Sequence, residues 1–111
     1  MIVNQKELVL ISYPFSNLVG RKVRPALVVS TDFLNRKSSD CLLVPLTSVI
    51  KNEPFSVLIT QKDLQAGKLI KNSRIRLDKI FNFEKEKIVL KIGILKDNVF
   101  KEIKKELFKM F

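Results

Sequence analysis

The sequence predicts a mostly-β fold with added helix, in the form of a small, partly open β-barrel closed by a C-terminal α-helix. Two patterns carry this prediction. Five or six short runs rich in β-branched residues are separated by Gly, Pro, Asn and Ser, and the last residues of the chain repeat apolar side chains at helical spacing. We expect one domain over residues 1–111, because this length and 46% hydrophobic residues supply one core.

The positive net charge favours anionic binding partners but does not identify one. Lys and Arg number 21 against 11 Asp and Glu, which gives a formal net charge of +10. Such a field attracts nucleic acid, anionic lipid or an acidic protein, although part of it can serve solubility alone.

The single cysteine and the absence of histidine remove several chemistries. Cys41 lies in an apolar run and is expected to be a buried small hydrophobe, and one cysteine makes no internal disulfide. Zinc sites built on thiolates or imidazoles are therefore excluded, and a reducing compartment is expected. No segment has the roughly 20 apolar residues that cross a bilayer, and no signal peptide is evident, so a soluble, cytoplasmic protein without membrane contact is predicted.

The strands and connectors follow in order along the chain. Strands are predicted at residues 7–13, 25–30, 41–46, 55–59, 73–80 and 87–95, with a short helical turn at 31–35 and a helical connector at 61–66. The loop at residues 15–24 is long for a hairpin and carries Arg21, Lys22 and Arg24 at its far end. Loops of this length in compact domains are often functional.

The C-terminal helix is predicted to cover one end of the sheet. Asp97 or Asn98 is the expected N-cap. Its apolar stripe consists of Val99, Ile103, Leu107 and Met110 or Phe111, widened by Phe100 and Phe108.

Arg24 is the first candidate for a binding side chain. Pro25 fixes its own φ angle and biases Arg24 toward an extended conformation, so its guanidinium is held at the start of a strand. A held arginine is a candidate anion or phosphate ligand. The alternative from these residues alone is a solvated turn between two strands.

Polar and apolar residues alternate over residues 73–80. This pattern places Ile75 and Leu77 toward the core and Arg74, Arg76 and Asp78 together on the other face. An Arg-x-Asp pair on a strand is equally a surface ion pair worth less than about 1 kcal/mol.

These residues suit one reaction in particular, the metal-independent cleavage of RNA. No Gly-rich phosphate loop, histidine triad or evident acidic metal cluster is present, and no cofactor is expected. In this reaction the 2′-OH attacks the adjacent phosphorus, and we expect Asp78 to take the proton of the 2′-OH. We expect Arg24 and Arg76 to neutralise the charge on the phosphorane oxygens, and Thr47 to donate a hydrogen bond to the same oxygens. Thr47 can alternatively cap a turn.

Three motifs in register resemble the MazF/PemK family of toxin endoribonucleases. They are Tyr13-Pro14-Phe15-Ser16-Asn17-Leu18 with Gly20 and the run from Arg24 to Ser30, then Val44-Pro45-Leu46-Thr47-Ser48, and then the run from Ser73 to Ile80. The resemblance implies an SH3-like barrel and a homodimer. It also implies cutting of single-stranded RNA at a short sequence, and neutralisation by a small acidic antitoxin.

The resemblance also implies roles for individual residues. Arg24 and Thr47 match the residues that act at the scissile phosphate in MazF-type members, whereas Arg76 and Asp78 match the acid and base of PemK-type members, so the identity of the base stays open. The further candidates for RNA contact are Asn17, Arg21, Lys22, Ser48 and Arg74.

Two positions depart from the family pattern. Lys6-Glu7 stands where Gly-Asp is usual, and Phe81 stands where an arginine is common.

The alternative function is a non-catalytic barrel of the same fold that binds nucleic acid or protein, including a degenerate toxin that binds only its antitoxin.

Overall fold

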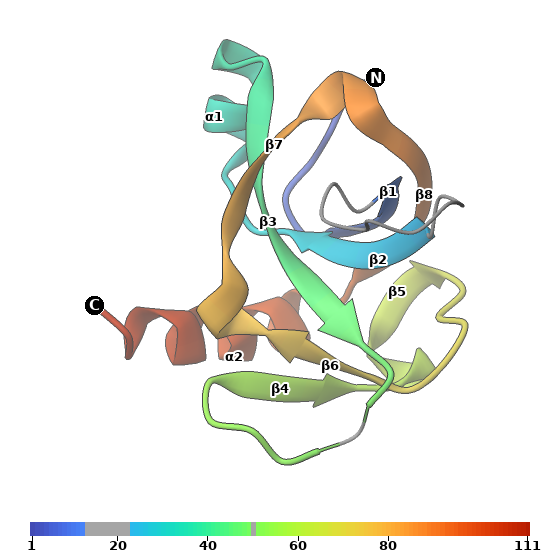
Figure 1. Cartoon of the computed structure of the whole chain (residues 1–111), viewed down its shortest axis with the longest axis vertical. Helices are drawn as coiled ribbons and strands as arrows, with labels where there is room; N and C mark the ends of the chain where they lie inside the picture. Colours follow the sequence, from blue (N-terminus) through green and yellow to red (C-terminus); the bar gives the residue numbers. More distant parts are fainter. Residues whose placement is uncertain (13–22, 50) are drawn as a thin grey trace.

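The computed structural model describes residues 1–12, 23–49 and 51–111. The described chain runs β1 (Glu7–Ser12), β2 (Val23–Val28), α1 (Asp32–Lys37), β3 (Asp40–Thr47), β4 (Ser56–Ile59), η1 (Gln61–Asp63), β5 (Leu64–Gly67), β6 (Ser73–Arg76), η2 (Leu77–Lys79), β7 (Phe81–Glu84), η3 (Lys85–Lys87), β8 (Ile88–Leu95) and α2 (Asp97–Phe108), where η marks a 3-10 turn. This arrangement confirms the mostly-β class with a C-terminal helix (Figure 1).

The strands form one antiparallel sheet in the order β4-β6-β3-β2-β1-β8-β5, with β7 as an additional partner of β3. β3 divides its second edge between two strands. Its first half, from Asp40 to Leu43, pairs with β7, and its last residues, Leu46 and Thr47, pair with β6. β6 and β7 leave β3 in different directions, and the sheet is curved as a result (Figure 1).

Alternation along the central strands separates two hydrophobic cores. Leu8, Leu27 and Val44 belong to one core, and the neighbouring residues Val9 and Ala26 belong to the other. α2 contributes to the first core through Phe100, Ile103 and Leu107 and lies against that face of the sheet (Figure 1). The opposite face, beyond the second core, is where β3, β6 and β4 present polar side chains.

Three sequence expectations need correction. β7 was not predicted, and the predicted strand over residues 73–80 ends at Arg76, where η2 turns the chain toward β7. The predicted connector at 61–66 is helical only to Asp63 and then forms β5. β5 ends at Gly67, whose φ of 92° and close approach to β8 require glycine, because a Cβ there would lie 2.2 Å from the Ile92 carbonyl oxygen.

The turn before β1 places a non-glycine residue in the left-handed region. Lys6 adopts a φ of 78°, in the left-handed region that favours glycine, and the Asn4 N–H donates to Glu7 Oε1 at 2.6 Å. A lysine thus occupies the left-handed position of this turn, and Glu7 closes the turn through its side chain. Lys6 also pairs with Asp97 at the start of α2.

The C-terminal helix forms as predicted, but its cap and its stripe differ. The N-cap is Lys96, so the expected N-cap at Asp97 or Asn98 was wrong. Phe100, Ile103 and Leu107 are buried, whereas Phe108 is 61% exposed and was wrongly included in the buried stripe. Phe108 lies about 100° around the helix from Leu107, which turns it away from the sheet.

Cys41 is buried in the second core, as predicted. Burial raises the pKa of its thiol to about 11, and its Sγ donates to the Phe83 carbonyl oxygen at 3.7 Å. Such a thiol is a poor nucleophile. No helix in the described parts of the chain is long and apolar enough to span a membrane.

Truncation of Ile103 tests the packing of α2. Ile103→Ala should lower the free energy of unfolding by about 2–5 kcal/mol, because Ile103 is fully buried between α2 and the sheet. Phe108→Ala, five residues along the same helix, should change it by less than about 1 kcal/mol. Urea unfolding followed by circular dichroism measures both, and equal losses would contradict this placement of the helix.

Candidate active site

Strand register collects the candidate polar side chains on one face of β3, β6 and β4. Thr47 lies opposite Arg74 in the β3–β6 pair, and Arg76 lies opposite Ser56 in the β4–β6 pair. Opposed residues share a face, as do residues two apart on a strand. Ile75, between the two arginines, points the other way and is fully buried. The face opposite α2 therefore carries Thr47, both arginines and Ser56.

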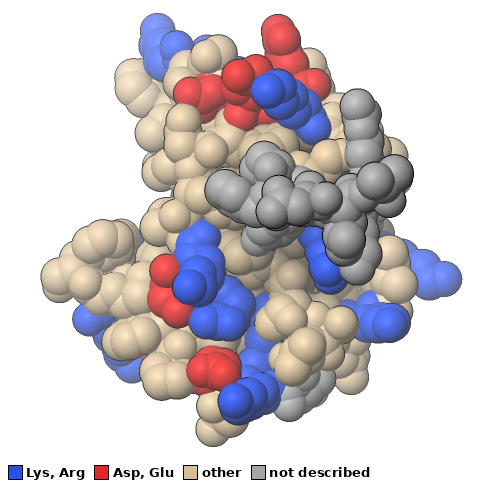
Figure 2. All heavy atoms as spheres, in the orientation of Figure 1, with Lys and Arg blue, Asp and Glu red and all other residues tan. Residues whose placement is uncertain are grey.

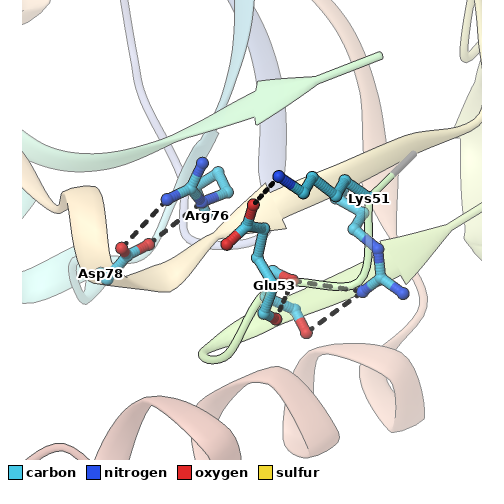
Figure 3. Close-up of polar contacts among 6 residues, drawn as sticks. Lys51, Glu53, Arg76 and Asp78 are labelled. Atoms are coloured by element: carbon cyan, nitrogen blue, oxygen red, sulfur yellow. Dashed lines mark hydrogen bonds and ion pairs between the residues drawn. The ribbon is translucent and has the colours of Figure 1, made fainter. Parts of the chain in front are cut away.

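Arg76 and Asp78 form a forked ion pair at the end of β6 (Figure 3). Arg76 Nε donates to Asp78 Oδ1 at 3.2 Å, and Arg76 Nη2 donates to Asp78 Oδ2 at 3.1 Å. Asp78 reaches back to the arginine because η2 replaces the predicted continuation of the strand. The hydrogen bonds from Arg76 lower the pKa of Asp78, and the bonds to Asp78 raise the pKa of Arg76.

Arg74 points to a different partner, so the predicted group of Arg74, Arg76 and Asp78 is divided. Arg74 Nη1 donates to Ser56 Oγ at 3.2 Å, and Ser56 Oγ in turn donates to the Glu53 carbonyl oxygen at 2.6 Å. Arg74 Nε is buried and has no hydrogen-bond partner among the described residues. A buried guanidinium N–H without a partner is unusual in a folded protein.

Thr47 and Ser48 lie where β3 ends. Thr47 is half-buried, and its Oγ1 accepts a hydrogen bond from the Val49 N–H at 3.2 Å. The hydroxyl thus caps a local turn while keeping its own proton available for donation. Ser48 is exposed beside it.

Arg24 lies inside β2, not in the preceding loop as expected, and its side chain is exposed. The register pairs it with Ile11 of β1, and β2 pairs with β3 at Ala26 and Pro45. Continued by two residues, the same register would set Arg24 beside Thr47. The predicted contacts Asn17, Arg21 and Lys22 lie outside the described residues.

The sequence interpretation did not single out the loop that leads into β4. Glu53 and Lys51 form an ion pair there at 3.8 Å, and Figure 3 shows Glu53 on the side of Arg76 away from Asp78. The Glu53 side chain is 35% exposed. The pairing of β4 with β6, which sets Ser56 opposite Arg76, brings this loop to the site, and the sequence alone carries no signal for that register.

Charge is unevenly distributed over this face. Figure 2 shows many Lys and Arg side chains in its lower half, over β4 and β6, and a cluster of Asp and Glu at the opposite end. A groove of about 640 Å³ at that other end is lined by Asp40, Asn82 and Glu84 among others. Its carboxylates disfavour a phosphate backbone, so the arginine group is the better anion site. Within the described ranges, no three His, Cys, Asp or Glu side chains gather to hold a metal ion.

The structure is thus a small, mostly-β protein with arginine and hydroxyl side chains on one face of its sheet. Residues 4–111 match the family model described as PemK-like, MazF-like toxin of type II toxin–antitoxin system. The chain therefore belongs to this toxin family, as the sequence motifs predicted.

Solved structures agree on the fold. A MazE–MazF complex from Deinococcus radiodurans is 19% identical with a TM-score of 0.79, and the match covers 99% of this chain and 96% of that chain. An endoribonuclease in complex with its cognate antitoxin from a Mycobacterial species is 18% identical with a TM-score of 0.78, and the match covers 96% of this chain and 92% of that chain. A comparison with curated protein sequences finds no match.

Removing the Asp78 carboxylate tests the ion pair. Asp78→Asn should lower stability at neutral pH by less than about 1 kcal/mol, because the pair is partly exposed. The pKa of Asp78 is lowered in the folded state, so the pair stabilises above the ordinary value of 3.8 and loses this effect as pH falls through the folded pKa. Thermal unfolding from pH 7 to pH 2 should show the two proteins converging in acid. A gap that widens on acidification would contradict the pair.

Proposed function

We propose that this protein is the toxin of a type II toxin–antitoxin pair and acts as a metal-independent, sequence-specific endoribonuclease. Its substrate is single-stranded RNA, and attack by the 2′-OH leaves 2′,3′-cyclic phosphate and 5′-OH ends. The observation that carries the proposal is the shared face of Thr47, Arg74 and Arg76 in a chain of the MazF-like toxin family. Among the similar structures, the Mycobacterial protein is an endoribonuclease.

Each side chain has a role suited to a pentavalent phosphorane. Arg24 and Arg76 neutralise the charge that develops on its oxygens, and the Thr47 O–H donates a hydrogen bond to the same oxygens. Asp78 keeps the Arg76 guanidinium oriented through two hydrogen bonds. The proposed contacts to the flanking RNA are the cationic residues Arg21, Lys22 and Arg74, the Ser48 hydroxyl and the Asn17 amide.

The partners follow from the charge and from the relatives. A net charge of +10 draws RNA toward the site and favours a small acidic antitoxin as the competing ligand. Both similar structures described above are complexes, one of an endoribonuclease with its cognate antitoxin and one of MazE with MazF, which supports this partner. We also propose that the active form is a cytoplasmic homodimer.

Cleavage in the presence of EDTA tests the proposed activity. Purified protein should cut a long single-stranded RNA at discrete positions and leave cyclic phosphate ends, because the nucleophile belongs to the RNA and the charge stabilisation to arginine. Primer extension maps the positions, and phosphatase treatment identifies the ends. Intact RNA after incubation with a large excess of folded protein would contradict the activity and favour a binding-only barrel.

Substitutions of Arg24 and Thr47 test the site. Arg24→Ala and Thr47→Ala should each lower the cleavage rate by about 100-fold or more, since each removes a group that stabilises the transition state. Thr47→Ser keeps the hydroxyl and should retain most activity. Arg36→Ala, an exposed arginine on α1, controls for the loss of charge. Full activity in Arg24→Ala would contradict its catalytic role, and a large fall in melting temperature would instead indicate a structural role.

A further inference from the structure

The proposed reaction needs a group that accepts the 2′-OH proton, and the chain has no histidine to do so. Two carboxylates lie beside Arg76 in the described structure, those of Asp78 and Glu53. The two carboxylates differ in the hydrogen bonds that their oxygens accept. This difference separates a carboxylate that orients the arginine from one that can take a proton.

The Asp78 carboxylate is poorly suited to accept a proton. Each of its oxygens accepts one hydrogen bond from the same guanidinium, at 3.2 and 3.1 Å. A substrate hydroxyl would have to compete with this fork for an oxygen lone pair. The same hydrogen bonds lower the pKa of Asp78, which makes its carboxylate a weaker base.

The Glu53 carboxylate is less constrained. Its ion pair with Lys51 spans 3.8 Å, which is too long for a hydrogen bond, and no hydrogen bond to its oxygens occurs within the described residues. Its backbone is nevertheless fixed, because the Glu53 carbonyl oxygen accepts from Ser56 Oγ, which also accepts from Arg74. A side chain with free lone pairs thus projects from an anchored position next to Arg76 (Figure 3).

We propose that Glu53 is the general base of the site and that Asp78 is a positioning residue for Arg76. This inference rests on the proposed ribonuclease function. In the step, the Glu53 carboxylate takes the proton of the 2′-OH while the 2′-oxygen of the RNA forms a bond to phosphorus. The bond from phosphorus to the 5′-oxygen breaks, and the departing oxygen takes a proton from solvent water.

A pH–rate profile of matched variants tests this assignment. Glu53→Gln should cut RNA about 100-fold or more slowly than the unsubstituted protein, which is the usual contribution of a general base, and its rate should lose the rise with pH in the acidic limb. Asp78→Asn should also be slower, because Arg76 is released, but should keep that limb. Glu53→Asp keeps the charge with a shorter reach and should retain intermediate activity.

The controls separate this assignment from the function on which it rests. Glu102→Gln makes the same charge change on the exposed surface of α2 and should leave the profile unchanged. A Glu53→Gln protein with normal rate and normal acidic limb overturns the assignment, as does loss of the limb in Asp78→Asn alone. An unsubstituted protein that cuts no RNA overturns the proposed function and this step together. Thermal unfolding of each variant shows whether a loss of rate reflects unfolding.

Discussion

The division of β3 between two partner strands is the constraint on which the rest of the structure depends. β7 pairs with it as far as Leu43, and β6 pairs with it from Leu46 onward. Pro45 stands between these two ladders and is opposite Ala26 of β2 on the other side. A proline has no N–H to give to a ladder, so the gap between partners is a position where it is tolerated inside a sheet. The sheet bends where its pairing is interrupted.

This change of partner also builds the site. The chain must leave β6 after Arg76 to reach β7, and it does so through η2. A strand would have carried Asp78 onward along the sheet, whereas the 3-10 turn brings it back to the arginine of the preceding strand. On the other edge of β6, pairing with β4 places Ser56 and the loop before it against the same arginines. Two strand ends and one turn thus hold a cluster of opposite charges.

The sequence predicted the features that depend on local chemistry. Pro25 predicted an extended Arg24, the 3.6-residue period predicted α2, and the apolar run around Cys41 predicted a buried strand. The features that depend on long-range strand pairing were not predicted from the sequence. β7 has four residues and a weak pattern, so its existence depends on the free edge of β3. Glu53 looked like an ordinary loop residue because its neighbours are set by strand register, which alternation alone does not fix.

The two carboxylates beside Arg76 illustrate how a site without histidine can use one carboxylate to orient an arginine and another to accept a proton. A carboxylate that holds an arginine through two hydrogen bonds gains orientation but loses basicity, because the same contacts that fix it stabilise its charged form. A single acidic residue therefore serves poorly as both anchor and base. Asp78 has the geometry of the anchor, fixed by both oxygens, and the proposed base, Glu53, keeps its lone pairs free on an anchored backbone. Separation of the two roles lets the arginine remain in place for the phosphorane while a neighbouring carboxylate exchanges a proton.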